Sequence, residues 1–165
     1  MFSAIVVAPT GTPALPIVRT LAALVPAVVH GLLRDLTLAC PPGADYAGIA
    51  DHAGCHLAAN GDAATALGAA IAGAREDWVL LLLAGFAPQD GFIDEAGDFI
   101  AGGRARAGLL RKVPEGFWTR LFPDWAGVAG VLGPTRAFAT GEDFAILAAR
   151  ATPRQTLNAR ARRVV

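Results

Sequence analysis

The sequence is poor in several residue types that would narrow its class. Its 165 residues include two cysteines, one methionine and one tyrosine, and 17% are charged. Two thiols are too few for a disulfide scaffold, and they fit a reducing cytoplasm. Lys plus Arg (14) equal Asp plus Glu (14), so no net charge attracts a nucleic acid. These shortages leave an ordinary globular protein that is expected to bind no nucleic acid.

Long apolar runs are also missing. No stretch approaches the roughly 20 residues that cross a bilayer, and residues 2–8 lack the basic start and the length of a signal peptide. We therefore expect a soluble, cytoplasmic chain. At this length, with no linker or repeat, residues 1–165 are expected to form a single domain.

One apolar run is present, and it is the centre of the sequence. Val79 to Leu83 are all apolar, without the polar alternation of a half-exposed strand. Such a run is typical of a strand covered on both faces in a parallel sheet. Ligands of open α/β sheets lie just beyond the carboxyl ends of such strands. The next residues, 84–88, contain no carboxylate, hydroxyl or histidine.

Strand-like and helix-like segments alternate around this run. Strands are predicted at residues 2–8, 35–39, 55–58, 79–83, 105–113, 127–132 and 156–160, the last as an edge strand. Helices are predicted in between, including one at 63–74 that Asp62 caps. This alternation predicts an α/β fold with three α/β/α layers and a mostly parallel central sheet.

The order of motifs resembles the family 2 glycosyltransferases, which have a GT-A fold and transfer a sugar from a nucleotide-sugar donor to an acceptor hydroxyl. The resemblance lies in an opening strand and turn at 5–10, a strand and loop at 35–45, a Gly-Glu-Asp motif at 141–143 and a basic end at 157–163. It implies that Asp143, beside Glu142, is the catalytic base. It places the nucleotide over Pro9, Thr10, Cys40, Asp45 and Gly85.

The sequence departs from the family where the family binds its metal. The Asp-x-Asp that holds a divalent cation on the donor falls on Leu83 and Gly85. Mg²⁺ and Mn²⁺ need oxygen ligands, and neither side chain supplies one. Cys40 stands where an Asp contacts the base. We therefore expect no metal cofactor, and a protein that is either inactive or metal-independent.

Two polar features have competing interpretations. Asp143 is either a general base or a carboxylate that a helix dipole stabilises. His52 and His56 flank Cys55 like zinc ligands, but Gly54 interrupts the helix that would align them, so a zinc site is not expected. Cys40 and Cys55 are expected to be buried free thiols, because no neighbouring positive charge favours a thiolate.

Two surface features also leave alternatives open. An aromatic segment at 117–125 follows basic residues and suits a membrane surface or a lipid- or glycan-type acceptor; alternatively it covers the sheet or forms a homodimer contact. Its candidate residues are Arg111, Lys112, Phe117, Trp118, Phe122 and Trp125. The five arginines between residues 150 and 163 are either solvated or contact an anionic ligand. The alternative to an enzyme is therefore a non-catalytic binding or assembly module that uses the aromatic segment to meet a partner or the inner face of a membrane.

Overall fold

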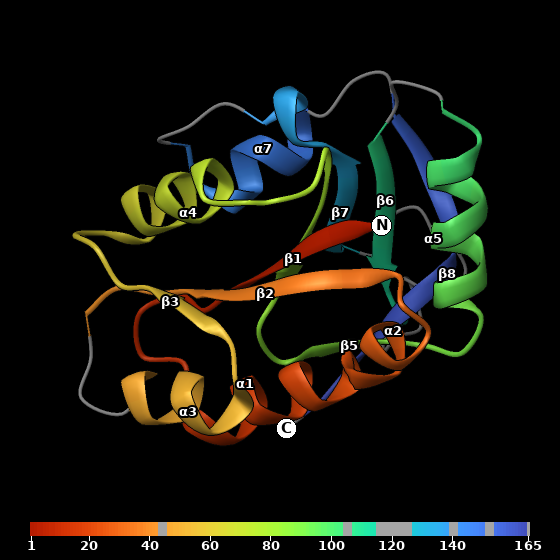
Figure 1. Cartoon of the computed structure of the whole chain (residues 1–165). Coiled ribbons are helices and arrows are strands. Elements are labelled where there is room, and N and C mark those ends of the chain that lie inside the picture. Colours follow the sequence, from red (N-terminus) through yellow and green to blue (C-terminus); the bar gives the residue numbers. More distant parts are fainter. Residues whose placement is uncertain (43–45, 104–106, 115–126, 139–141, 151–153, 165) are drawn as a thin grey trace.

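The protein is built on one eight-stranded sheet with helices on both faces (Figure 1). The computed structural model describes residues 1–42, 46–103, 107–114, 127–138, 142–150 and 154–164. The strand order is β3-β2-β1-β4-β7-β6-β8-β5. This arrangement confirms the predicted α/β class.

The first half of the sheet is parallel. Its elements are β1 (Phe2–Val7), α1 (Ala14–Ala23), α2 (Val25–Val29), β2 (Leu33–Ala39), α3 (Tyr46–Ala53), β3 (His56–Ala58), α4 (Ala63–Ala72) and β4 (Trp78–Leu83). β1 pairs in parallel with β2 and with β4, and β2 pairs in parallel with β3. As predicted, Asp62 caps α4, since its Oδ1 accepts the N–H of Thr65 at 2.8 Å.

The second half of the sheet is mixed. Its elements are β5 (Phe86–Pro88), α5 (Phe92–Ala101), β6 (Ala107–Lys112), β7 (Val128–Pro134), a 3₁₀ turn at Thr135–Ala137, α7 (Phe144–Arg150) and β8 (Arg154–Arg163). β7 pairs antiparallel with β4 and β6, β8 pairs in parallel with β6, and β5 pairs antiparallel with β8. Because β7 is antiparallel to both β4 and β6, β6 runs parallel to β4.

The central strand is buried on both faces, as its unbroken apolar sequence predicts. Leu80 and Leu82 belong to the core on one face, beneath α1 and α5, while Val79 and Leu81 belong to the core on the other face. All four are fully buried. α4 and α7 cover the second face (Figure 1).

Two details of the sheet differ from the sequence-based expectation. The last strand is not at an edge: β8 lies between β6 and β5. β5 itself was not expected, because three residues that end in a proline carry too little strand signal. β5 is a strand because it pairs with β8, not because of its local sequence.

Two further expectations concern a membrane-spanning helix and the aromatic segment at 117–125. Within the described part of the chain, no helix is long and apolar enough to cross a membrane. The aromatic residues Phe117, Trp118, Phe122 and Trp125 lie outside the described residues.

Candidate functional site

The strands that precede the predicted nucleotide site end side by side. In the sheet register Val7 of β1 pairs with Ala39 of β2 and with Leu83 of β4. The pairing continues past the strand ends, since the N–H of Ala84 donates to Val7 O at 2.9 Å. Pro9, Cys40 and Gly85 therefore follow neighbouring strands at one edge of the sheet, which we call the carboxyl edge.

Gly85 holds the chain as it turns out of β4. Its φ of +88° lies in the region that favours glycine. Its N–H donates to Thr20 Oγ1 of α1 at 2.9 Å, and its carbonyl accepts the N–H of Val164 at 2.8 Å. Both backbone groups are thus engaged, by the first helix and by the segment that follows β8.

The loop after β1 is a closed turn. Pro9 O accepts from both the N–H and the hydroxyl of Thr12, at 3.1 and 2.7 Å. The Tyr46 hydroxyl of α3 donates to Thr12 O at 3.3 Å and fastens the turn to that helix. Pro9 and Thr10 are exposed, so their side chains are accessible to a ligand at the carboxyl edge.

The two thiols are free, as expected. Cys40 is buried directly after β2, and its N–H donates to Ala58 O of the β3 strand at 3.1 Å. Burial raises the pKa of the Cys40 thiol, and the nearby Cys55 raises it further. Burial also raises the pKa of Cys55. Both thiols are therefore protonated at neutral pH and unsuited to nucleophilic work.

The predicted catalytic pair lies at the beginning of α7. Asp143 directly precedes the helix and is exposed, while its backbone carbonyl accepts the N–H of Ile146 and of Leu147, both at 3.0 Å. Glu142 forms an ion pair with Arg150 on the last turn of the same helix. Glu142 is therefore occupied by a structural partner, and Asp143 is the more exposed of the two carboxylates. Asp45 lies outside the described residues.

The residues at the carboxyl edge do not fit a divalent cation. Leu83 is half-buried and packs against the core of the second face, and Gly85 has no side chain. Across the described residues, no three His, Cys, Asp or Glu side chains lie together in a way that would hold a metal ion. The Nδ1 of His52 lies 2.7 Å from Gly48 O, within its own helix.

Basic side chains lie at the other half of the carboxyl edge. Their position there was not predicted from the sequence. Gly130 of β7 pairs with Leu82 of β4 and with Leu110 of β6, so Lys112, two residues beyond Leu110, lies near the carboxyl end of β4. The Lys112 ammonium lies 4.6 Å from the centre of the Phe86 ring, a cation–π contact. Arg163 of β8 pairs directly with Phe86. The arginine-rich end was visible in the sequence, but its place beside Phe86 depends on the unexpected β5–β8 pairing.

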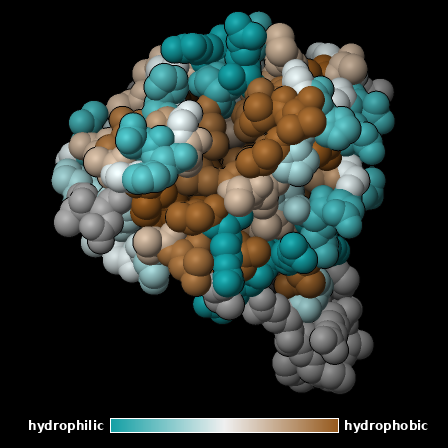
Figure 2. Space-filling view, turned by 60° about the horizontal axis from the view of Figure 1, so that its bottom comes forward, coloured by the Kyte–Doolittle hydropathy of each residue, from teal (hydrophilic) through white to brown (hydrophobic). Residues whose placement is uncertain are grey.

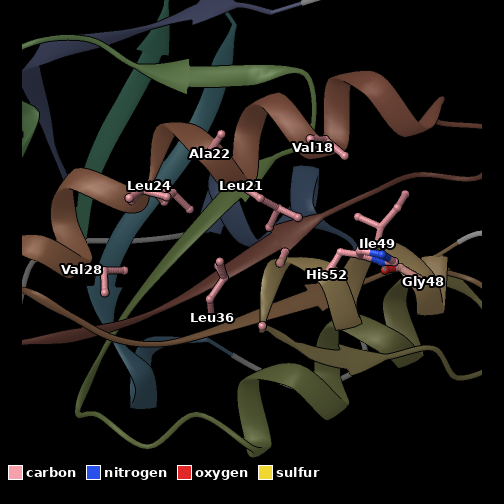
Figure 3. A pocket seen from close by; sticks show the side chains of 12 residues that line it. Val18, Leu21, Ala22, Leu24, Val28, Leu36, Gly48, Ile49 and His52 are labelled. Atoms are coloured by element: carbon pink, nitrogen blue, oxygen red, sulfur yellow. Dashed lines mark hydrogen bonds between the residues drawn. The ribbon is translucent and has the colours of Figure 1, made fainter.

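An apolar groove lies on the face that carries α1, α2 and α3, where hydrophobic residues gather around a hollow (Figure 2). Its volume is about 690 Å³. Side chains from α1, α2 and α3 form its walls, and Leu36 of β2 contributes from the sheet (Figure 3). Val18, Val25 and Val28 remain about half exposed, at 46%, 54% and 53%. The groove was not predicted, because it depends on how α3 sits beside α1.

Solved structures of similar fold identify the architecture. Glucosyl-3-phosphoglycerate synthase from Mycobacterium tuberculosis superposes with a TM-score of 0.62 at 15% identity, over 94% of this chain and 69% of that one. A mycobacterial protein gives 0.66 at 17%, over 98% and 64%. Mannosyl-3-phosphoglycerate synthase from Rubrobacter xylanophilus gives 0.57 at 16%, over 83% and 55%. The fold is that of GT-A glycosyltransferases.

At these identities the likeness establishes the fold alone. The chain spans between 55% and 69% of the length of those three structures. The mycobacterial synthase has been solved with Mn²⁺, UDP-glucose and phosphoglyceric acid. No protein-family model and no curated protein matches the sequence.

Proposed function

We propose that this chain is a glycosyltransferase-like protein that binds a nucleotide-sugar at the carboxyl edge without a divalent metal. The observation that carries the proposal is the alignment of Pro9, Cys40 and Gly85 beyond neighbouring parallel strands. This is the place where open α/β sheets bind ligands. Similar structures that bind UDP-glucose and Mn²⁺ support the ligand class, whereas Leu83 and Gly85 argue against the metal.

Asp143 is the proposed base if the protein transfers sugar. An exposed carboxylate at a helix start accepts a proton from an acceptor hydroxyl when it lies within hydrogen-bond distance of that hydroxyl. Glu142 does not take this role, because its ion pair with Arg150 holds it. The acceptor is proposed only as a molecule with a reactive hydroxyl.

The test is calorimetric titration with UDP-glucose, GDP-mannose and their nucleoside diphosphates in EDTA, followed by product analysis with candidate acceptors. Binding of one nucleotide-sugar in EDTA is the expected result. Absence of binding to every one of them at millimolar concentration contradicts the proposal. If transfer is found, Asp143→Asn is expected to lower kcat by about a hundredfold or more while leaving the Kd of the donor nearly unchanged. The matched control Asp51→Asn, on the exposed side of α3, is expected to keep full activity.

A second candidate is a non-catalytic binding module, and the apolar groove favours it. Its walls expose several valines. An exposed apolar patch of this kind is typical of an interaction site. This alternative predicts no nucleotide binding in the same titrations. It also predicts that Val25→Asp together with Val28→Asp abolishes an association that the native chain forms in solution.

A further inference from the structure

The carboxyl edge has an uneven distribution of charge. The ends of β1, β2 and β4 carry Ala8, Cys40 and Leu83, none of them charged at neutral pH. The ends of β6 and β8, further along the same edge, carry basic residues, which are Arg111, Lys112, Arg160, Arg162 and Arg163. Cations thus lie on one side of an edge where the metal-binding carboxylates of a GT-A enzyme are missing.

The closing strand brings these cations against the end of β4. Val164 donates its N–H to the carbonyl of Gly85 at 2.8 Å, and Arg163 pairs with Phe86 on β5. Arg163 therefore directly precedes the residue whose N–H contacts Gly85, the position that resembles the second metal-binding Asp. The pairing fixes this proximity, because β5 and β8 share a register over three residues.

Lys112 approaches the same point from β6. Its ammonium lies over the Phe86 ring at 4.6 Å from the ring centre. In an antiparallel pair, residues directly opposite point to the same face of the sheet. Arg163 and Phe86 are such a pair, and Lys112 lies over the Phe86 ring, so Lys112 and Arg163 lie on one face of the sheet. Lys112 is half-buried and Arg163 is exposed.

Over the residues that the structure describes, neither Lys112 nor Arg163 forms an ion pair with a carboxylate. The carboxylate that α5 presents to β8, Glu95, accepts instead from the N–H groups of Asn158 and Ala159, both at 2.7 Å. Two cations held near one aromatic ring without a counter-charge favour an anionic ligand.

Arg160 carries a buried donor on the opposite face of the sheet, because it pairs with Arg111 of β6, whereas Lys112 pairs with Ala161. Its Nη1 atom is buried and has no hydrogen-bond partner among the described residues. Arg160 is a further basic feature of this edge and does not belong to the pair formed by Lys112 and Arg163.

We propose that Lys112 and Arg163 bind the diphosphate of a nucleotide-linked ligand directly, in the place where a GT-A enzyme would hold a divalent cation. Two side-chain cations match the charge of one divalent ion, and both are charge-assisted donors to phosphate oxygen. The inference rests on the proposed function and adds the residues that neutralise the phosphates. No chemical step is assigned to these cations.

The test is calorimetric titration of the whole chain with inorganic diphosphate and with UDP, both in EDTA. The variants are Lys112→Gln, Arg163→Gln and the double variant, each checked by its circular dichroism spectrum. We expect each single change to weaken both ligands about tenfold, which is the loss of one charge-assisted contact. Lys112→Arg, which keeps the charge, is expected to retain most of the affinity. Arg136→Gln removes an exposed arginine from the 3₁₀ turn after β7 and is the matched control, expected to bind as the native chain does.

The outcomes separate this inference from the proposed function. UDP binding in EDTA that the Lys112 and Arg163 variants do not weaken overturns the inference and leaves the function standing. Diphosphate binding that these variants weaken, without binding of any nucleotide, supports the cation site and contradicts the proposed function. Equal weakening by Arg136→Gln would show non-specific charge attraction and overturn the inference. Binding of neither ligand overturns both.

Discussion

The two halves of the sheet end differently at the same edge. In the parallel half, β1, β2 and β4 end in uncharged residues, and the backbone there is tied to Thr20 and Val164. In the mixed half, β6 and β8 end in lysine and arginines. The comparison indicates that the charge at this edge belongs to the mixed half of the sheet and is basic.

Each of the two core clusters nevertheless spans both halves of the sheet, and the largest predicted effect tests this. Leu81 of β4 is fully buried and pairs with Val131 of β7 across the junction. Leu81→Ala is expected to lower the free energy of unfolding by about 2–5 kcal/mol, measured by urea denaturation. The transition should stay single and cooperative. Two separate transitions would mean that the halves unfold independently. Ile146→Ala, at a residue 42% exposed, should change stability by less than about 0.5 kcal/mol.

Glycine at the junction allows the two halves to approach. A Cβ on Gly130 would lie 2.9 Å from the backbone oxygen of Leu81, too close for a real contact. Gly130→Ala is therefore expected to destabilise the protein by about 1–3 kcal/mol, measured by thermal or urea unfolding. Gly97→Ala is the opposite control, because Gly97 lies in α5 with open space around it. It should stabilise the protein by about 0.5–1 kcal/mol. Equal effects of the two changes would contradict the close approach.

Thr20 anchors the end of the parallel half. Its hydroxyl donates to Pro16 O and accepts from the Gly85 N–H, both at 2.9 Å, and the residue is fully buried. Thr20→Val keeps the shape and leaves Gly85 N–H without its partner, at an expected cost of about 1–3 kcal/mol. Thr156→Val, at an exposed residue of β8, is the control and should cost less than about 0.5 kcal/mol. A neutral Thr20→Val would mean that water replaces the hydroxyl.

The smallest predicted effect concerns the cap of α4 in the parallel half. Hydrogen bonds from Thr65 hold the pKa of Asp62 below its ordinary value of 3.8. Because the folded-state pKa is depressed, this stabilisation is present above the unfolded-state pKa and is lost as the pH falls through the folded one. Asp62→Ala should lower Tm by a few degrees at pH 7, and the difference should shrink in strong acid. Asp62→Asn keeps the cap without the titration, so its Tm should lack that pH dependence.

The sequence predicted what depends on local pattern. The unbroken apolar run at 79–83 identified the central strand, and an Asp before an alanine-rich segment identified the cap of α4. The resemblance to glycosyltransferases anticipated the GT-A fold. The sequence did not predict that Arg163 lies beside Phe86. This position depends on the three-residue strand β5, which has no recognisable sequence signal of its own. The roles of Asp143 and of Leu83 stay predictions, since they depend on a ligand.

The most direct measurement is the Kd of UDP for the native chain in Mn²⁺ and in EDTA, at equal ionic strength because salt screens exposed cations. If Lys112 and Arg163 neutralise the diphosphate, the two values should agree within about twofold, a difference of less than about 0.5 kcal/mol. Binding at least tenfold tighter in Mn²⁺ would contradict the account, because it would require metal ligands that Leu83 and Gly85 cannot supply.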